Sequence, residues 1–284
     1  MTEETFYLLN NDVIFKNIFN TKERLKKLLE AILKVKINDI KDRNTELERN
    51  NKKTKKFILD LLLETDVGKI NVEVNNNSDN YIIKRNLLYF FRLIGMSLKK
   101  SESYEEVKKH IQINLTWGLQ KYYEYDIRNR NMIELYIMDE KSHKRRYEDV
   151  FKIVEVNMDY YHRLCYNEDM KEDEKLLKFL SSKDEKELKE NSRGDRFMEK
   201  LEEEVRILNN DPELMEELLV EGEEERVRNT ERILGRREGI EEGKIEGANE
   251  RNIIIAKNML NKNMDISTIS EITGLTESEI ENLK

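Results

Sequence analysis

The sequence predicts an α/β protein in which a mixed sheet core flanked by helices is followed by a helical C-terminal arm. Strand-like and helix-like runs alternate through the first 165 residues, and helical patterns alone fill the rest. The charge divides at almost the same place. Residues 1–160 carry 30 Lys and Arg against 26 Asp and Glu, a net charge of +4, whereas residues 161–284 carry 21 against 33, a net charge of −12. Only the front part therefore favours an anionic partner.

The chain opens with a pattern typical of one or two amphipathic helices. The first stretch runs from Asp12 to Phe19, with Asp12 where an N-cap is expected. The second shows a stripe with helical spacing, formed by Leu25, Leu28, Leu29, Ile32 and Leu33. Residues 34–56 are polar and rich in Lys and Asn, with a short strand expected near Ile37.

A β-hairpin is predicted next. Residues 57–63 are apolar except for Asp60, and residues 70–75 alternate around Glu73. Asp66 and Gly68 supply the residues typical of a turn, which we centre on Asp66 and Val67. A helix is expected over residues 80–99. Strands are expected at 110–117, 132–138 and 150–158, which gives about five strands around one core.

The back half reads as helices. Residues 171–208 are helical in pattern, and Asp211-Pro212 is a strong helix start for a segment that reaches about residue 260. Two short helices are expected in residues 265–284: Gly274 ends the first, and Thr276 with Glu279 forms a capping box for the second. We therefore predict a core at 1–165, a helical extension at 166–210, a long arm at 211–262 and a helical hairpin at 263–284.

Composition excludes several classes of protein. A single cysteine, Cys165, excludes a disulfide framework and a Cys-rich zinc site, and we expect it to be a buried small apolar residue. No run approaches 18 apolar residues, so we expect no membrane span. No signal peptide is recognisable at the N-terminus, and a cytoplasmic protein is expected.

Asp60 and Glu73 are the candidate chemical pair. With the turn at Asp66-Val67 they fall nearly opposite each other on the hairpin, and Asn71 and Asn75 share their face. Facing carboxylates in an apolar hairpin repel each other and lose hydration, and a hard cation such as Mg²⁺ offsets both effects. The alternative is that both side chains lie on a solvated face of a twisted hairpin.

Several blocks, in order, resemble the PD-(D/E)XK nuclease family transposases, also called the recombination-promoting nuclease family. The blocks are the Asp12-Val-Ile-Phe-Lys-Asn-Ile-Phe helix, the Leu59-Asp60 strand, the Asn71-Val-Glu73-Val-Asn75 strand, Tyr81 with Lys84-Arg85 through Tyr89, Ser103-Tyr104 to Ile113-Asn114-Leu115, and the tail with its Glu-Gly repeats, Ile255-Ala256-Lys257 and Ile272-Thr273-Gly274-Leu275-Thr276. The resemblance covers most of the chain and implies a restriction-endonuclease-like fold.

The resemblance also implies roles for individual residues. Asp60 and Glu73 would hold Mg²⁺ or Mn²⁺, with Asp12 as an auxiliary acid or, alternatively, only a helix cap. The family motif has Lys or Gln two residues after the Glu. Here that position is Asn75, which is shorter and can only hydrogen-bond. Lys84 or Arg85 would then supply the cation, and the alternative for Arg85 is a salt bridge to Glu73 or solvent exposure.

DNA is the expected partner. Lys53, Lys55 and Lys56 precede the Asp60 strand and, with Lys84, are candidate phosphate contacts that would make binding depend on salt. The alternative is a set of solvated loops in a Lys-rich protein.

The arm carries Gly235, Gly239, Gly243 and Gly247 at intervals of four residues. Each costs roughly 1 kcal/mol relative to Ala in a helix, so a function is expected. Close helix–helix approach along this stripe would make the protein a homo-oligomer through its C-terminal helices, and a solvated spacer is the alternative. The last helix is rich in acid, which favours a packing or partner-binding tail over a DNA-reading helix-turn-helix.

Together these features predict a metal-dependent DNA endonuclease that hydrolyses phosphodiesters with metal-activated water. The alternative is a catalytically degenerate nuclease fold that acts as an oligomeric interaction or regulatory module. A helix-turn-helix regulator is a third, weaker reading.

Overall fold

The computed structural model describes residues 5–46, 58–76, 81–97, 103–165 and 170–283. The chain divides into two compact units, Met1–Leu214 and Met215–Lys284. In the described residues, no helix combines the length and the apolar character needed to cross a bilayer.

The first unit is built on a six-stranded mixed sheet, which bears out the predicted fold class. Its strands are β1 (Ile40–Glu46), β2 (Ile58–Thr65), β3 (Gly68–Asn75), β4 (His110–Thr116), β5 (Met132–Leu135) and β8 (Phe151–Asn157), in the order β1-β2-β3-β4-β8-β5. The central strands β3, β4 and β8 are parallel, and the outer pairs are antiparallel. A separate ribbon pairs β6 (Ile137–Met138) with β7 (Arg145–Arg146). The sheet has one strand more than expected, and β1 begins three residues after Ile37.

The β2–β3 hairpin has the predicted two-residue turn. Thr65 pairs with Gly68, which leaves Asp66 and Val67 as the turn. Gly68 has φ +138°, and a Cβ placed there would lie 2.4 Å from the carbonyl oxygen of Lys109. Only glycine fits this position, because both the backbone angle and the close approach of β4 exclude a side chain.

Each central strand alternates between an apolar and a polar face. The apolar face carries Leu61 and Leu63 of β2, Ile70 and Val72 of β3, and Ile111, Ile113, Val154 and Val156 of the next two strands, all buried. Since β3, β4 and β8 are interior parallel strands, their second face is also buried, although it carries polar side chains.

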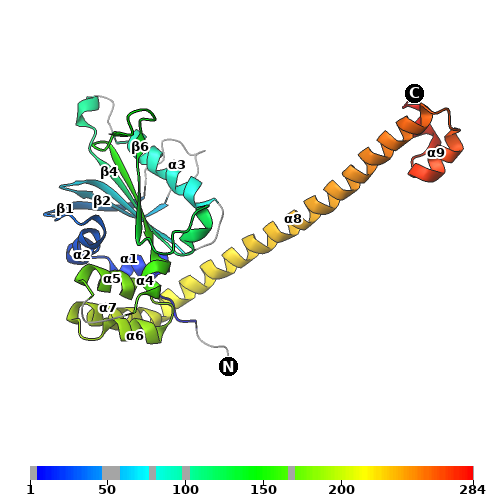
Figure 1. Ribbon diagram of the computed structural model, residues 1–284. Coiled ribbons are helices and arrows are strands. Elements are labelled where there is room, and N and C mark those ends of the chain that lie inside the picture. The colour runs from blue at the N-terminus through cyan, green and yellow to red at the C-terminus, as the bar shows by residue number, and fades with distance from the viewer. Residues whose placement is uncertain (1–4, 47–57, 77–80, 98–102, 166–169, 284) are drawn as a thin grey trace. The chain divides into compact units, whose positions relative to one another are not determined.

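Helices surround the sheet. They are α1 (Asp12–Ile18), α2 (Lys22–Leu33), α3 (Ile82–Gly95), α4 (Met158–Arg163), α5 (Glu172–Leu180), α6 (Glu185–Ser192) and α7 (Arg196–Asn209), with short 3₁₀ turns at Tyr104–Glu106 and Leu119–Tyr122. In Figure 1, α3 runs along the sheet, whereas α1, α2 and α4–α7 gather below it in this view. A paired contact ties α7 to α2: Arg24 donates to both carboxylate oxygens of Glu204, at 2.6 and 2.5 Å.

One predicted cap and one predicted burial are wrong. Asn11, not Asp12, caps α1, because its side-chain oxygen accepts from the backbone N–H groups of Val13 and Ile14. Asp12 is the first helical residue and pairs with Lys16 one turn later, at 2.8 Å. Cys165 is exposed rather than buried, because it lies just past the end of α4.

The second unit consists of most of α8 (Pro212–Leu260), with α9 (Ile266–Thr273) and α10 (Glu277–Glu281). The end of α8 packs with the two short helices around Ala256, Ile269 and Ile280. Gly274 ends α9 with φ +70°, and Thr276 with Glu279 forms the capping box of α10, both as predicted. The two short helices of the tail thus pack against the end of α8.

Candidate active site

Polar side chains form two rows across the three parallel strands. In the first row, Glu73 of β3 pairs with Asn114 of β4, which pairs with Glu155 of β8. The row above it, toward the carboxyl ends of the strands, contains Asn75, Thr116 and Asn157. All six side chains are buried, and Glu73 and Glu155 are each only 3% exposed. Two carboxylates thus lie inside the protein on one face of the sheet.

Side-chain amides link these carboxylates. Asn71 donates through Nδ2 to Glu73 Oε1 and to Gln112 Oε1, both at 2.9 Å. Gln112 Nε2 donates to Asn114 Oδ1 at 2.7 Å, and Asn114 Nδ2 donates to Glu155 Oε1 at 2.7 Å. The chain of amides gives these buried polar groups hydrogen-bond partners, with Asn71 Oδ1 as the exception among the described residues.

Helix α3 covers this polar face. Asn86 donates through Nδ2 to Asn75 Oδ1 at 3.2 Å and to Asn114 Oδ1 at 3.3 Å. Arg85 Nη2 donates to the same Asn75 oxygen at 3.4 Å, from a mostly exposed position. Nearer the start of β8, Phe90 packs edge-on against Phe151 with ring centroids 6.1 Å apart. One end of α3 is therefore polar toward the sheet, and the other is apolar.

Burial sets the electrostatics of this face. It raises the pKa of Glu155 to about 7, against the opposing effect of hydrogen bonds from Asn114 and Thr116. Burial also lowers the pKa of His110, at the start of β4, to about 4, so that this imidazole is neutral at pH 7. It raises the pKa of Tyr123, to which the charge of Glu155 also contributes.

Asp60 lies next to Glu73 along the hairpin ladder. Leu61 pairs with Val72, so the residue before Leu61 on β2 is in line with the residue after Val72 on β3. The side chain of Asp60 lies outside the described part of the molecule. The predicted pair is thus adjacent in backbone register.

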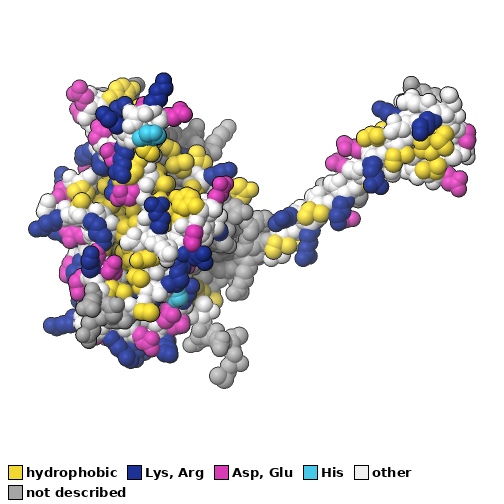
Figure 2. Space-filling view, in the orientation of Figure 1, with side chains coloured by type: hydrophobic (Ala, Val, Ile, Leu, Met, Phe, Trp, Pro, Cys, Tyr) yellow, Lys and Arg dark blue, Asp and Glu magenta, His cyan; other side chains and the backbone are white. Residues whose placement is uncertain are grey.

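The other predicted residues are placed as follows. Asn75 lies at the carboxyl end of β3, held by Arg85 and Asn86, and Lys84 is exposed on α3. The segment before α1 reaches the same end of β3, where Asn10 Nδ2 donates to Asn76 Oδ1 at 3.1 Å, two residues before Asp12. The three candidate DNA contacts Lys53, Lys55 and Lys56 lie outside the described residues. Lys and Arg side chains of the first unit are dispersed among acidic ones in Figure 2.

Sequence reasoning assigned no role to Glu155, Asn114, Gln112 or Asn86. A signal for the first was present, because Glu155 interrupts an apolar strand in the same way as Asp60 and Glu73 do. Gln112 and Asn114 alternate with apolar residues along β4, which also resembles a strand with one solvated face. Only the parallel pairing on both sides of β4 shows that this face is interior.

The donors on this face suit a hard cation. They are carboxylate and amide oxygens, the ligand types that Mg²⁺ prefers. Asn71 Oδ1, on the residue that bonds Glu73, is buried and has no hydrogen-bond partner within the described part of the chain. No cluster of three or more His, Cys, Asp or Glu side chains suited to a metal occurs among the described residues, and the Asp60 side chain is not one of these. A metal here would need Asp60 beside Glu73.

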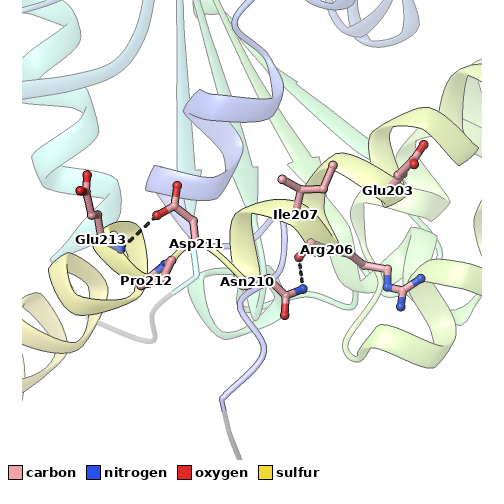
Figure 3. Close-up of a pocket in the computed structure, with 7 residues that line it drawn as sticks. All are labelled: Glu203, Arg206, Ile207, Asn210, Asp211, Pro212 and Glu213. Atoms are coloured by element: carbon pink, nitrogen blue, oxygen red, sulfur yellow. Dashed lines mark hydrogen bonds between the residues drawn. The ribbon is translucent and has the colours of Figure 1, made fainter.

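The first unit also has a pocket that lies away from the polar face of the sheet. A pocket of about 830 Å³ lies at the junction of α7 and α8, lined by Glu203, Arg206, Asp211 and Glu213 among others (Figure 3). Asp211 caps α8 by accepting from the backbone N–H groups of Glu213 and Leu214, and Arg206 pairs with Glu185 at 3.4 Å. Asp211 therefore stabilises the start of α8, and Arg206 links α7 to α6. No residue that lines this pocket belongs to the predicted site.

A mixed sheet with buried carboxylates on its central strands, approached by a basic helix, is the arrangement of a nuclease-like α/β core. Comparison with protein families bears this out. The model of the PD-(D/E)XK nuclease family transposases matches residues 9–230, and the chain belongs to this family.

A second family model describes the tail. The C-terminal HTH domain of the Rpn/YhgA-like nuclease family matches residues 249–284, which are the end of α8 with α9 and α10. This match gives the tail the helix-turn-helix class that its acid-rich last helix had argued against. No curated protein and no solved structure matches the chain.

Proposed function

We propose that the protein is a metal-dependent DNA endonuclease that hydrolyses phosphodiester bonds. The observation that carries the proposal is the position of Glu73, a buried carboxylate on a central parallel strand, directly in line with Asp60 on the hairpin. Membership of a nuclease family supports the same reaction class.

Asp60 and Glu73 would hold the ion, Mg²⁺ or Mn²⁺, with Asp12 as the auxiliary acid near the same end of β3. When bound, the ion supplies charge neutralisation at the scissile phosphate and lowers the pKa of a bound water. Asn71 holds one Glu73 oxygen through its N–H group, which orients the carboxylate before any ion binds.

Arg85 takes the place of the missing motif cation in this proposal. Its guanidinium reaches Asn75 Oδ1 while the side chain stays largely exposed, so the remaining N–H groups can meet a phosphate oxygen. Lys84 on the same helix, together with Lys53, Lys55 and Lys56, would extend the contact along the DNA backbone.

Plasmid cleavage tests the function. Supercoiled DNA incubated with pure protein should be nicked or linearised in Mg²⁺ or Mn²⁺ and stay intact when EDTA replaces the metal. Asp60→Asn should abolish the cleavage, and Glu64→Gln, a carboxylate on the same hairpin that pairs with Lys108, serves as the matched control. Cutting that persists unchanged in Asp60→Asn removes the proposed metal site.

One observation favours a degenerate site instead. Asn75 is buried, its oxygen accepts from Asn86 and Arg85, and its Nδ2 donates to Thr116 at 3.2 Å. With its oxygen occupied twice and one of its two N–H donors engaged among the described residues, this side chain has a single N–H left for a water. Metal binding without cleavage of any DNA form would support this second function, an interaction or regulatory module on a nuclease fold.

The second unit is the proposed means of assembly and of further DNA contact. Its helix-turn-helix class is consistent with DNA binding, and the C-terminal helices are the proposed site of homo-oligomerisation. Gly235, Gly239, Gly243 and Gly247 on α8 have open space where a Cβ would be, so a second helix can approach this stripe closely.

A further inference from the structure

The amides on the polar face form a chain with one direction. Asn71 donates to Gln112, Gln112 donates to Asn114, and Asn114 donates to Glu155. Gln112 and Asn114 each accept with the amide oxygen and donate with the amide nitrogen, so both are turned the same way. At the far end, Asn71 Oδ1 is left buried with no partner among the described residues.

The carboxylate of Glu155 explains this direction. An ionised carboxylate can only accept hydrogen bonds, so Asn114 must turn its NH₂ toward Glu155 and its oxygen toward Gln112. Gln112 must then direct its NH₂ to Asn114 and its oxygen to Asn71. Each amide orientation fixes the next, and bonds in such a chain polarise one another. Glu73 at the other end favours the same direction, because it also receives an N–H from Asn71, and so does Asn86, which donates to Asn114 Oδ1.

We propose that Glu155 is a positioning residue, whose carboxylate fixes the direction of the amide chain and thereby which atom Asn71 turns toward Glu73. This inference rests on the proposed function, in which Glu73 is part of the catalytic site. Glu155 itself is separated from Glu73 by Asn114 in the row and touches no reacting group.

When Glu155 becomes protonated, its side chain no longer fixes the direction of the amide chain. A protonated Glu155 carries an O–H donor, so it no longer requires the NH₂ of Asn114, and only Asn86, which donates to Asn114 Oδ1 at 3.3 Å, still favours this orientation of Asn114. If the chain reverses, Asn71 turns its oxygen toward Glu73 Oε1, and two acceptors then face each other. A cavity of about 20 Å³, lined by Asn86, Gln112, Asn114 and Glu155 among others, has room for one water beside these groups. Protonation at Glu155 is thereby coupled to the charge on Glu73.

Among the described residues, no charged group forms an ion pair with Glu155. Tyr123, just past the second 3₁₀ turn, is close enough for the charge of Glu155 to raise its pKa. Glu73 lies across Asn114 in the same row, Arg85 reaches Asn75 in the next row, and His110 lies four residues before Asn114 on β4. The raised pKa of Glu155, about 7, places the release of the chain near neutral pH.

Side-chain amide NMR of the full-length protein tests the proposal without requiring cleavage. Between pH 6 and 8, the NH₂ resonances of Asn71, Gln112 and Asn114 should shift together with one midpoint. In Glu155→Gln they should lose this titration. Glu134→Gln, which removes a carboxylate of the neighbouring strand β5 that pairs with Lys152, should leave it unchanged. A response confined to Asn114, or no response, overturns the proposal, and the wild-type titration decides this even if Glu155→Gln does not fold.

DNA cleavage tests the proposal independently of the NMR titration. The acidic limb of the pH–rate profile should follow the amide midpoint in the wild type and move by about one unit or more in Glu155→Gln. An unchanged acidic limb overturns the link between Glu155 and Glu73. If no DNA is cleaved while the amides titrate together, the proposed function fails and the positioning role of Glu155 stands.

Discussion

The ionisation of Glu155 affects the stability of the fold as well as the orientation of the amide side chains. Its pKa is about 7 in the folded chain against a reference of 4.5, so above pH 4.5 the unfolded chain releases this proton more readily than the folded one. The contribution of Glu155 to stability is fully present below pH 4.5 and is lost as the pH rises through 7. We expect the wild type to lose roughly 3 kcal/mol across this window relative to Glu155→Gln.

Urea unfolding at several pH values measures this difference. Glu155→Gln keeps the shape of the side chain and removes the ionisation, so the stability of the variant relative to the wild type should rise between about pH 4.5 and pH 7 and level off above pH 7. Parallel stability curves for the two proteins would contradict the raised pKa. Glu134→Gln, largely solvated and paired with Lys152, is the control.

At the scale of single residues, the sequence indicated candidate site residues better than it indicated their burial and their hydrogen-bond partners. Asp60 and Glu73 are adjacent in register because the turn residues Asp66 and Val67 define the hairpin locally. Glu155 was missed because its partner, Asn114, lies 41 residues earlier and belongs to a strand whose neighbours no local pattern reveals. Asn11 and Asp12 are both good caps, and only the backbone geometry of α1 distinguishes them.

At the scale of elements, the hairpin depends on Gly68. Gly68→Ala would place a Cβ 2.4 Å from a backbone oxygen of Lys109 and hold alanine at φ +138°, so we expect a loss of more than about 2 kcal/mol of stability. Gly118→Ala is the matched control, because its φ is +71° and its Cβ would meet nothing within 4 Å. Only the general cost of a left-handed residue, about 1 kcal/mol, applies there.

Thermal unfolding of the two variants distinguishes these costs. Equal stability losses at Gly68 and Gly118 would show that the close approach of β3 to β4 is not what requires glycine. The helices and the hairpin could be predicted because their signals are local: spacing, caps and turns. The order of the sheet strands could not, since β8 inserts between β4 and β5 through contacts that are distant in sequence.

At the scale of the whole molecule, substitutions in the glycine stripe of α8 distinguish an assembly surface from a solvated spacer. If two helices approach along it, Gly239→Ala with Gly243→Ala should shift the protein toward the monomer in light scattering. If the segment is a solvated spacer, the same variant should keep its oligomeric state and gain about 1 kcal/mol of helix stability per site. An unchanged mass would contradict assembly through this stripe.

The nuclease family of the chain and the helix-turn-helix class of its tail are also properties of the whole molecule. The ordered blocks from Asp12 to Leu115 predicted the nuclease family, which the family model over residues 9–230 bears out. The acidity of α10 points away from a helix-turn-helix, whereas the packing of Ala256, Ile269 and Ile280 that joins the three helices cannot be read from the sequence.

Whether Glu73 holds a catalytic metal is tested by the rate of Mg²⁺-dependent cleavage of plasmid DNA by Glu73→Gln, with Glu64→Gln as the control. A metal ion supplies several kcal/mol of transition-state stabilisation, so removing a ligand carboxylate should slow cleavage by at least roughly 100-fold. The control should cut at nearly the wild-type rate. Equal rates for Glu73→Gln and the wild type would show that Glu73 holds no catalytic metal.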